Sequence, residues 1–193
     1  EKKKIVITLS RVFPTTHSRK GQPTGFKEKL ASGCKLHTIR GNFDQWNAIA
    51  EKMQRGGYCL SIRQWSGRPY NSPQVEIAHL DQPIGIQRIE LHYHSENDTI
   101  TAASTVGRID ADCYEIAKND GLNTTDFKEW FFGRHPKGDK VFHGVIIHFT
   151  DFGIDMRHQE SIIQQTCVRW FRMKYPQLAL LLFAVPNGGA RLR

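Results

Sequence analysis

Gly33-Cys34-Lys35-Leu36-His37-Thr38-Ile39-Arg40 is the stretch from which the fold and the binding cleft are predicted. The glycine frees the backbone to turn, and if the chain then enters a strand, Thr38 and Arg40 project to one face. Lys35 stands three residues before Thr38, so an ammonium, a hydroxyl and a guanidinium group converge. Such a set can hold a phosphate or a carbonyl group. A desolvated lysine beside a threonine can also take its proton in nucleophilic catalysis.

Short runs of β-branched and aromatic residues around this stretch predict strands, and spacings of three and four predict helices. The order contains no alternation of strand, helix and strand. It therefore favours an α+β fold, with a small and mostly antiparallel β-barrel carrying helical inserts on its rim. The first run is expected to be buried on both faces. The predicted strands are 4–9, 58–65, 74–80, 84–94 and 141–149, and the predicted helices are 26–31, 42–54, 110–119 and 124–132.

The chain changes character after its first 152 residues, which we assign to this barrel domain. Residues 159–174 have the pattern of an amphipathic helix, and 178–185 form an uninterrupted apolar run that enters a glycine-rich turn. One helix and one strand cannot build a core alone. We therefore expect residues 157–193 to be the incomplete start of a second domain.

Basic residues gather at both ends of a chain whose net charge is +8. Residues 1–40 hold ten lysines and arginines against two acids, and residues 157–193 hold six against one, whereas residues 41–156 hold eleven against sixteen. Two basic ends are expected if each approaches phosphate groups. Exposed lysines that only aid solubility explain the charge equally well.

Apolar runs and cysteine spacing limit the class of protein. No apolar run approaches the roughly 20 residues that cross a bilayer, and the lysine-rich start lacks the apolar segment of a signal peptide. The four cysteines have long, irregular gaps without a Cys-x-x-Cys pair, which argues against a zinc knuckle and a disulfide framework. We expect a soluble, cytoplasmic protein with reduced thiols, no membrane partner and no cofactor in this chain.

The string Gly-x-Lys-x-x-Thr-Ile-Arg within residues 33–40 resembles the signature of ASCH domains, relatives of the PUA fold. The resemblance covers residues 3–149 and implies a PUA-like barrel that binds RNA or a nucleotide-like ligand. Some bacterial ASCH proteins are amidohydrolases that deacylate N4-acylated cytidine with a lysine, a threonine and a later glutamate. The resemblance then implies Lys35 as base, Thr38 as nucleophile and Asp120 in place of the glutamate, an acid one methylene shorter.

Further residues are candidates to line the same cleft because aromatic planes beside guanidinium groups suit base stacking with phosphate contact. These are Arg63, Trp65 and Arg68, although Trp65 is equally well explained as a core aromatic. Histidines repeat on two predicted strands, but no acid or thiol accompanies them at a spacing typical of a metal site.

A second resemblance lies in three segments, which together are similar to the opening of a VRR-NUC nuclease domain of the PD-(D/E)XK superfamily. They are His158-Gln159-Glu160-Ser161-Ile162-Ile163-Gln164-Gln165, Trp170-Phe171, and Phe183-Ala184-Val185-Pro186-Asn187-Gly188-Gly189-Ala190-Arg191. Such enzymes cut phosphodiesters with Mg²⁺ or Mn²⁺, held mainly by a later Asp and a Glu-x-Lys that this chain does not contain. The resemblance implies Glu160 as an early metal ligand in a complete domain. Otherwise Glu160 only offsets the dipole of its helix.

Three functions therefore compete at the end of the sequence analysis. The first is an ASCH-like module that binds a nucleic acid or a modified nucleotide, from a parent protein fused to a nuclease. The second is an amidohydrolase that uses Lys35, Thr38 and Asp120. The third is an adaptor for a partner protein, which is favoured if side chains from residues 14–25 fill the cleft.

Overall fold

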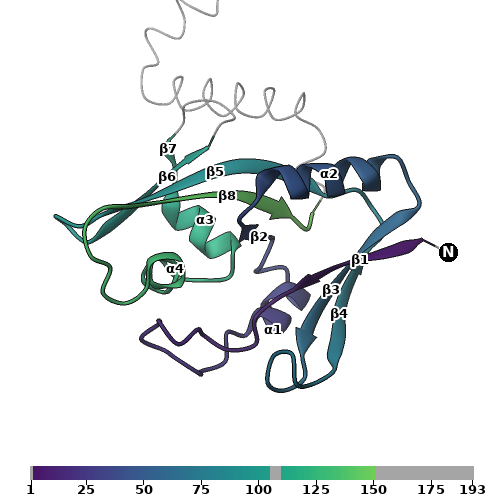
Figure 1. Cartoon of the computed structure of the whole chain (residues 1–193), viewed down its shortest axis with the longest axis horizontal. Coiled ribbons are helices and arrows are strands. Elements are labelled where there is room, and N and C mark those ends of the chain that lie inside the picture. Colours follow the sequence, from purple (N-terminus) through teal and green to yellow (C-terminus); the bar gives the residue numbers. More distant parts are fainter. Residues whose placement is uncertain (1, 105–109, 151–193) are drawn as a thin grey trace, which may run out of the picture. The chain divides into compact units, whose positions relative to one another are not determined.

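A computed structural model describes residues 2–104 and 110–150, which form two β-sheets and four helices (Figure 1). All of them belong to one unit, Glu1–Ile154. The expected second domain at 157–193, with Glu160, lies outside the described residues, so the domain division stays a prediction. The elements in order are β1 (Lys3–Thr8), α1 (Phe26–Ala31), β2 (His37–Arg40), α2 (Phe43–Gln54), β3 (Tyr58–Trp65), β4 (Gln74–Leu80), β5 (Gly85–His94), β6 (Thr99–Ser104), β7 (Asp110–Ala111), α3 (Cys113–Asn119), α4 (Thr124–Phe132) and β8 (Lys140–His148).

The smaller sheet has the order β1-β3-β4. β1 pairs with β3 in parallel, and β3 pairs with β4 in antiparallel fashion. The expectation that the first strand is buried on both faces is wrong. β1 is an edge strand that buries Ile7 on one face, while Val6 on the other face is 42% exposed. An apolar run of this length indicates a strand but does not show how many neighbours will cover it.

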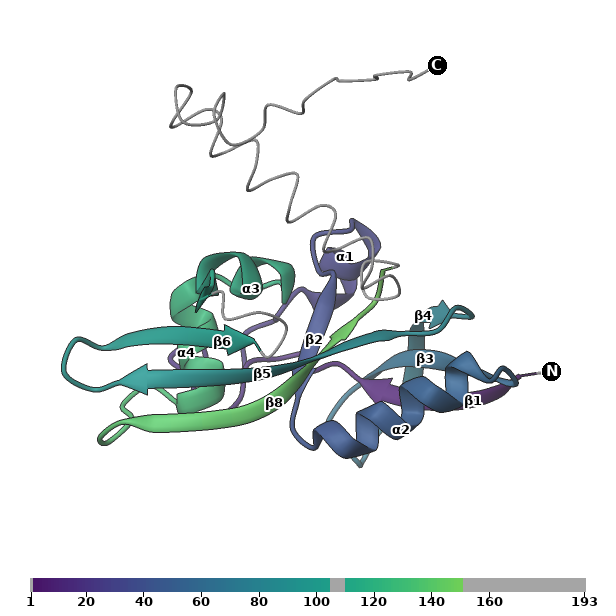
Figure 2. The ribbon, with the colours of Figure 1, turned by 90° about the horizontal axis from the view of Figure 1, so that it is seen from above.

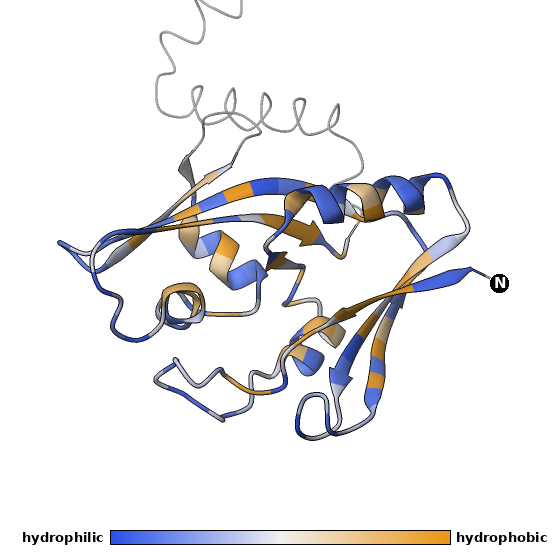
Figure 3. Cartoon of the chain, in the orientation of Figure 1, coloured by the Kyte–Doolittle hydropathy of each residue, from blue (hydrophilic) through white to orange (hydrophobic). Residues whose placement is uncertain are grey.

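The larger sheet has the order β2-β8-β5-β6-β7, and its described pairings are antiparallel. The carboxyl-terminal half of β8 is apolar and buried (Figure 3). β6 escaped prediction because its sequence, TITAAS, is made mostly of small residues that carry little hydrophobic signal.

The two sheets are separate hydrogen-bonded ladders within residues 2–104 and 110–150, and they do not close into one barrel. The α+β class is therefore confirmed, whereas the closed barrel is not. α2 packs against β3 and also against β5 and β8, so it bridges the two sheets (Figure 2). It does so with Trp46, Ala50 and Met53, which are the apolar residues spaced at three and four along the helix.

α3 and α4 pack against each other, and α3 also packs against β6. α4 buries Phe127 completely, and it is capped by Asn123, whose side chain accepts from the amide of Asp126 at 2.7 Å. None of the helices in the described residues is long and apolar enough to cross a membrane.

Candidate functional site

Residues 10–25, here called the strap, form an ordered excursion between β1 and α1. Its two halves pair with each other, since the amide of Phe13 donates to the carbonyl of Gln22 at 2.9 Å and Val12 bridges Pro23. Phe13 and His17 are buried, which is unusual for a loop. The strap is therefore a packed part of the fold, and its composition alone did not show this.

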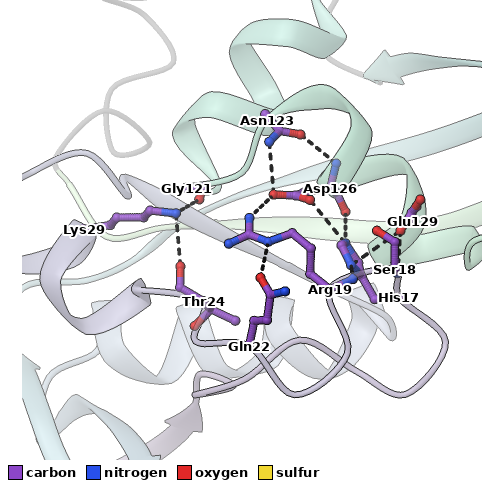
Figure 4. A network of polar contacts seen from close by, with 10 residues as sticks. All are labelled: His17, Ser18, Arg19, Gln22, Thr24, Lys29, Gly121, Asn123, Asp126 and Glu129. Atoms are coloured by element: carbon purple, nitrogen blue, oxygen red, sulfur yellow. Dashed lines mark hydrogen bonds and ion pairs between the residues drawn. The ribbon is translucent and has the colours of Figure 1, made fainter.

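A polar network fastens the strap to α4 (Figure 4). The guanidinium of Arg19 lies 2.7 Å from Asp126, and the amide of Ser18 donates to Glu129 at 2.7 Å. The ring of His17 lies between these acids, with Nε2 3.1 Å from the carbonyl of Asp126 and Nδ1 3.4 Å from Glu129. Both acids lie in the first turns of α4, and their closest contacts are with the strap.

Lys35 and Asp120 form a buried ion pair, although they lie 85 residues apart in the sequence. The Lys35 ammonium is 2.6 Å from Oδ1 of Asp120 and also donates to the carbonyl of the same residue. The face of the Phe26 ring lies 4.2 Å from Lys35 Nζ. The structure thus brings together two of the three residues to which the resemblance assigns catalysis.

Local backbone conformations place this pair. Gly33 ends the turn after α1 with a φ of 72°, and the amide of Leu36 then donates to the carbonyl of Asn119, which draws the chain against α3. Gly121 has a φ of 79°, and a Cβ there would stand 3.3 to 3.4 Å from the side chains of Lys29 and Lys35. The glycine after Asp120 therefore serves both the turn and the close approach.

Thr38 and Arg40 project to one face of β2, as their spacing predicts. Nη1 of Arg40 donates to Oγ1 of Thr38 at 2.9 Å, and Nη2 donates to the carbonyl of Thr8 at 2.9 Å. Arg40 thereby ties β2 of the larger sheet to the end of β1 in the smaller one. Its positive charge also acts on the titration of Lys35 and Asp120.

Burial dominates the electrostatics of this cluster. Desolvation lowers the pKa of Lys35 and raises the pKa of Asp120, because removal from water disfavours both charges. Their mutual attraction opposes both shifts. Lys35, Thr38 and Asp120 are only 1%, 2% and 3% exposed, so the cleft expected from the sequence is a closed cluster in this conformation.

An open groove lies at the end of the smaller sheet at which β1 and β3 end and β4 begins. We call this the Trp65 groove, and its volume is about 560 Å³. Trp65 stacks obliquely on Tyr70, with ring centroids 5.3 Å apart. Tyr70 is 88% exposed and has a φ of 65°. The lining residues are Thr8, Ser10, Arg11, Val12, Trp65, Gly67, Arg68, Pro69, Tyr70 and Gln74.

Two of the three residues predicted to accompany the cleft, Trp65 and Arg68, line this groove. Arg63 does not, because its Nε donates to Ser61 at 2.9 Å on the neighbouring part of β3. Sequence reasoning missed Arg11 and Tyr70. Tyr70 carried one detectable signal, since an aromatic residue next to Arg68-Pro69 in a polar turn has no core to join.

Trp65 and Arg11 also border a second cavity of about 390 Å³, which reaches Phe26. Because Phe26 in turn covers Lys35, this cavity lies between the open groove and the closed cluster. The cavity thus shares Arg11 and Trp65 with the groove and Phe26 with the surroundings of Lys35.

A different pocket of about 270 Å³ lies between the larger sheet and α3. Its lining includes His37 and His148, which are paired in register and whose rings are 5.8 Å apart. Burial lowers the pKa of His37 to about 3 and that of His148 to about 4. Both rings are therefore neutral at ordinary pH, and His37 Nε2 donates to the carbonyl of Ile116.

Comparison of this chain with protein-family models, with curated proteins and with solved structures finds no match.

Proposed function

We propose that the Trp65 groove binds a single-stranded nucleic acid or a nucleotide, with a base against Trp65 and Tyr70 and phosphate near Arg11 and Arg68. One observation carries this proposal: the half-buried Trp65 and the exposed Tyr70 stack on each other in the same groove as two arginines. Stacking on aromatic faces together with phosphate contact is how proteins hold unpaired nucleotides.

The charge of the groove supports this ligand. Its lining contains two arginines and no aspartate or glutamate, so an anion meets no opposing carboxylate there. The guanidinium of Arg11 donates to the carbonyl of Ser66, which holds it at the rim, and Arg68 makes no ion pair within the described residues. The groove volume of about 560 Å³ lies within the usual range for small-ligand sites.

We further propose that the chain is an ASCH-like, PUA-related module of a parent protein that continues into a nuclease. The signature at residues 33–40 supports the first part, and its lysine, threonine and arginine lie in one cluster. The second part rests on the sequence of residues 157–193 alone. Mg²⁺ or Mn²⁺ enters only with a complete nuclease domain.

Binding of short RNA and DNA oligonucleotides, followed by fluorescence anisotropy over a range of salt, tests the groove. Affinity should fall as salt rises. Trp65→Ala should weaken binding by about 5- to 150-fold, which corresponds to roughly 1–3 kcal/mol of stacking. Arg68→Ala should weaken binding uniformly across sequences and reduce the salt dependence by about one phosphate contact.

Arg55→Ala supplies the matched control, because Arg55 is a 78% exposed arginine at the end of α2, outside the groove. It removes the same charge and should leave binding close to that of the wild type. Equal losses in Arg55→Ala and Arg68→Ala would show a non-specific charge effect. The proposal would be refuted by an affinity that is the same in Trp65→Ala as in the wild type and that does not change with salt.

Deacylation of N4-acylated cytidine is the second candidate function, favoured by the Lys35–Asp120 pair and by the hydrogen bond from Arg40 to Thr38. In this reaction a neutral Lys35, whose proton has passed to Asp120, takes the proton of Oγ1 as Thr38 attacks the acyl carbonyl. The bond from the carbonyl carbon to N4 then breaks, cytidine leaves with that proton, and water hydrolyses the Thr38 ester to release the acid. The cluster is closed, so substrate entry requires displacement of the side chains above it. Release of cytidine by wild type but not by Thr38→Val would support this activity; no release by wild type would exclude it.

A further inference from the structure

A second group of metal-ligating side chains lies on the outer face of the smaller sheet, away from the Lys35 cluster. The register of β3 and β4 sets Ser61 opposite His79, so Cys59, two residues before Ser61, lies on the same face. Asp81 follows β4 directly and completes the group. The ligating atoms of Cys59, His79 and Asp81 all lie within 4.8 Å of one another.

We propose that Cys59, His79 and Asp81 bind a divalent transition metal, with Zn²⁺ as the best fit. Zinc takes thiolate, imidazole and carboxylate ligands at roughly 2.0–2.3 Å, so neighbouring ligand atoms in a tetrahedral site are about 3.5 Å apart. His79 Nε2 and Asp81 Oδ1 are already 3.4 Å apart. A set of one sulfur, one nitrogen and one oxygen suits Zn²⁺ better than Mg²⁺ or Ca²⁺, which prefer oxygen.

The other ring nitrogen of His79 supports this assignment. Nδ1 lies 3.7 Å from Oε1 of Glu76, while Oε2 of Glu76 accepts from Ser61 and from Lys4 at 3.1 Å. A carboxylate that hydrogen-bonds the second nitrogen of a ligating histidine fixes the ring and its tautomer, and Glu76, at 3.7 Å, is placed to take this role once the ion binds.

The charges balance around a bound ion. Cys59 as thiolate and Asp81 as carboxylate neutralise Zn²⁺, and Glu76 stays paired with Lys4. The Cys59 thiol, which contacts the carbonyl of Lys3 at 3.6 Å, loses its proton to solvent on binding. Lys2 lies 3.5 Å from Asp81 Oδ1 but is half-exposed, so it can swing away while keeping its bond to the Asp81 carbonyl.

Three ligands come from the protein, so the fourth position is open to water or to a donor atom of a ligand. The ion would join Cys59 of β3 to His79 of β4 and to Asp81 just after it, and would so hold the two strands together. This site is independent of the Trp65 groove, and its success or failure does not bear on nucleic-acid binding.

Titration of the full chain with Co²⁺ under reducing conditions tests the site. Thiolate ligation gives a sulfur-to-cobalt charge-transfer band in the near ultraviolet, and excess Zn²⁺ should remove it. We expect one ion per chain with release of a proton. Cys59→Ser should abolish the band, and Glu76→Gln should weaken metal affinity by roughly 10- to 100-fold.

Matched variants separate this site from other thiols and histidines. Cys113→Ser and His143→Ala should leave the band unchanged; His143 contacts Glu90 at 3.2 Å and is not one of the three residues of the proposed site. Because Cys59 is buried and its replacement can disturb folding, His79→Ala at a partly exposed position provides a second test. A wild-type chain without the band, or a band that survives both Cys59→Ser and His79→Ala, would overturn the proposal.

Discussion

Replacement of Asp120 by asparagine removes one charge from the Lys35 pair and keeps the size and the carbonyl acceptor. Lys35 then remains 1% exposed, with an ammonium group that has lost its counter-ion at 2.6 Å. Breaking a buried pair in this way typically costs about 3–5 kcal/mol. This loss of stability has an upper limit, because Lys35 can instead release its proton, and deprotonation of an ordinary lysine at pH 7 costs about 4.6 kcal/mol.

The pH dependence distinguishes this loss from general damage. In the variant, the pKa of Lys35 in the folded state falls further below its unfolded value, so the unfolded chain binds more protons. The free energy of unfolding should therefore rise as the pH increases from 7 towards 10, more steeply than in wild type. Urea denaturation followed by circular dichroism at pH 7 and pH 9 measures both quantities.

Two variants complete this test. Lys35→Met combined with Asp120→Asn removes both charges and should recover part of the loss, since no uncompensated ion remains. Asp44→Asn breaks an exposed pair, with Asp44 92% exposed, and should cost less than about 1 kcal/mol. A loss below about 1 kcal/mol in Asp120→Asn would show that Lys35 is solvated and that the cluster is open in solution.

Three other variants or conditions test separate parts of the structure. In the folded state the pKa values of His37 and His148 are about 3 and 4, below the unfolded value of 6.5. The free energy of unfolding should therefore be constant above pH 6.5 and fall below it by about 1.4 kcal/mol per pH unit for each histidine. A denaturation midpoint that does not change from pH 7 to pH 5 would contradict their burial. Gly121→Ala should lower the free energy of unfolding, measured by thermal denaturation, by more than the roughly 1–2 kcal/mol expected of Gly138→Ala. Both glycines have a positive φ, but only at Gly121 would a Cβ meet two lysine side chains. Equal losses in the two variants would argue against that close approach. Arg19→Ala should lower the free energy of unfolding by roughly 1 kcal/mol, because it removes the ion pair with Asp126. It should also speed hydrogen exchange of the amides within residues 13–22, measured by mass spectrometry. Unchanged exchange would show that the strap does not depend on this ion pair.

Helices and strands were predicted correctly where large apolar side chains recur at the spacing of the element. The helix at 42–54 and the strand at 58–65 were predicted within a residue because their apolar spacing matches the period of each structure. The strand at 99–104 was missed because small residues carry no such signal. The edge position of the strand at 3–8 depends on pairing with a distant strand, which no local pattern contains.

The sequence by itself determined the α+β class, most of the elements and the grouping of Thr38 with Arg40, since alternation along a strand is a property of neighbouring residues. Only the tertiary structure decided that Lys35 and Asp120 are buried and that Trp65 and Tyr70 share an open groove. It also decided that Cys59 lies close to His79 and Asp81. The first and the last of these outcomes depend on strand register and on contacts between residues 20 (Cys59 and His79) to 85 (Lys35 and Asp120) positions apart. Local propensity does not encode such contacts, because burial of the whole core selects them.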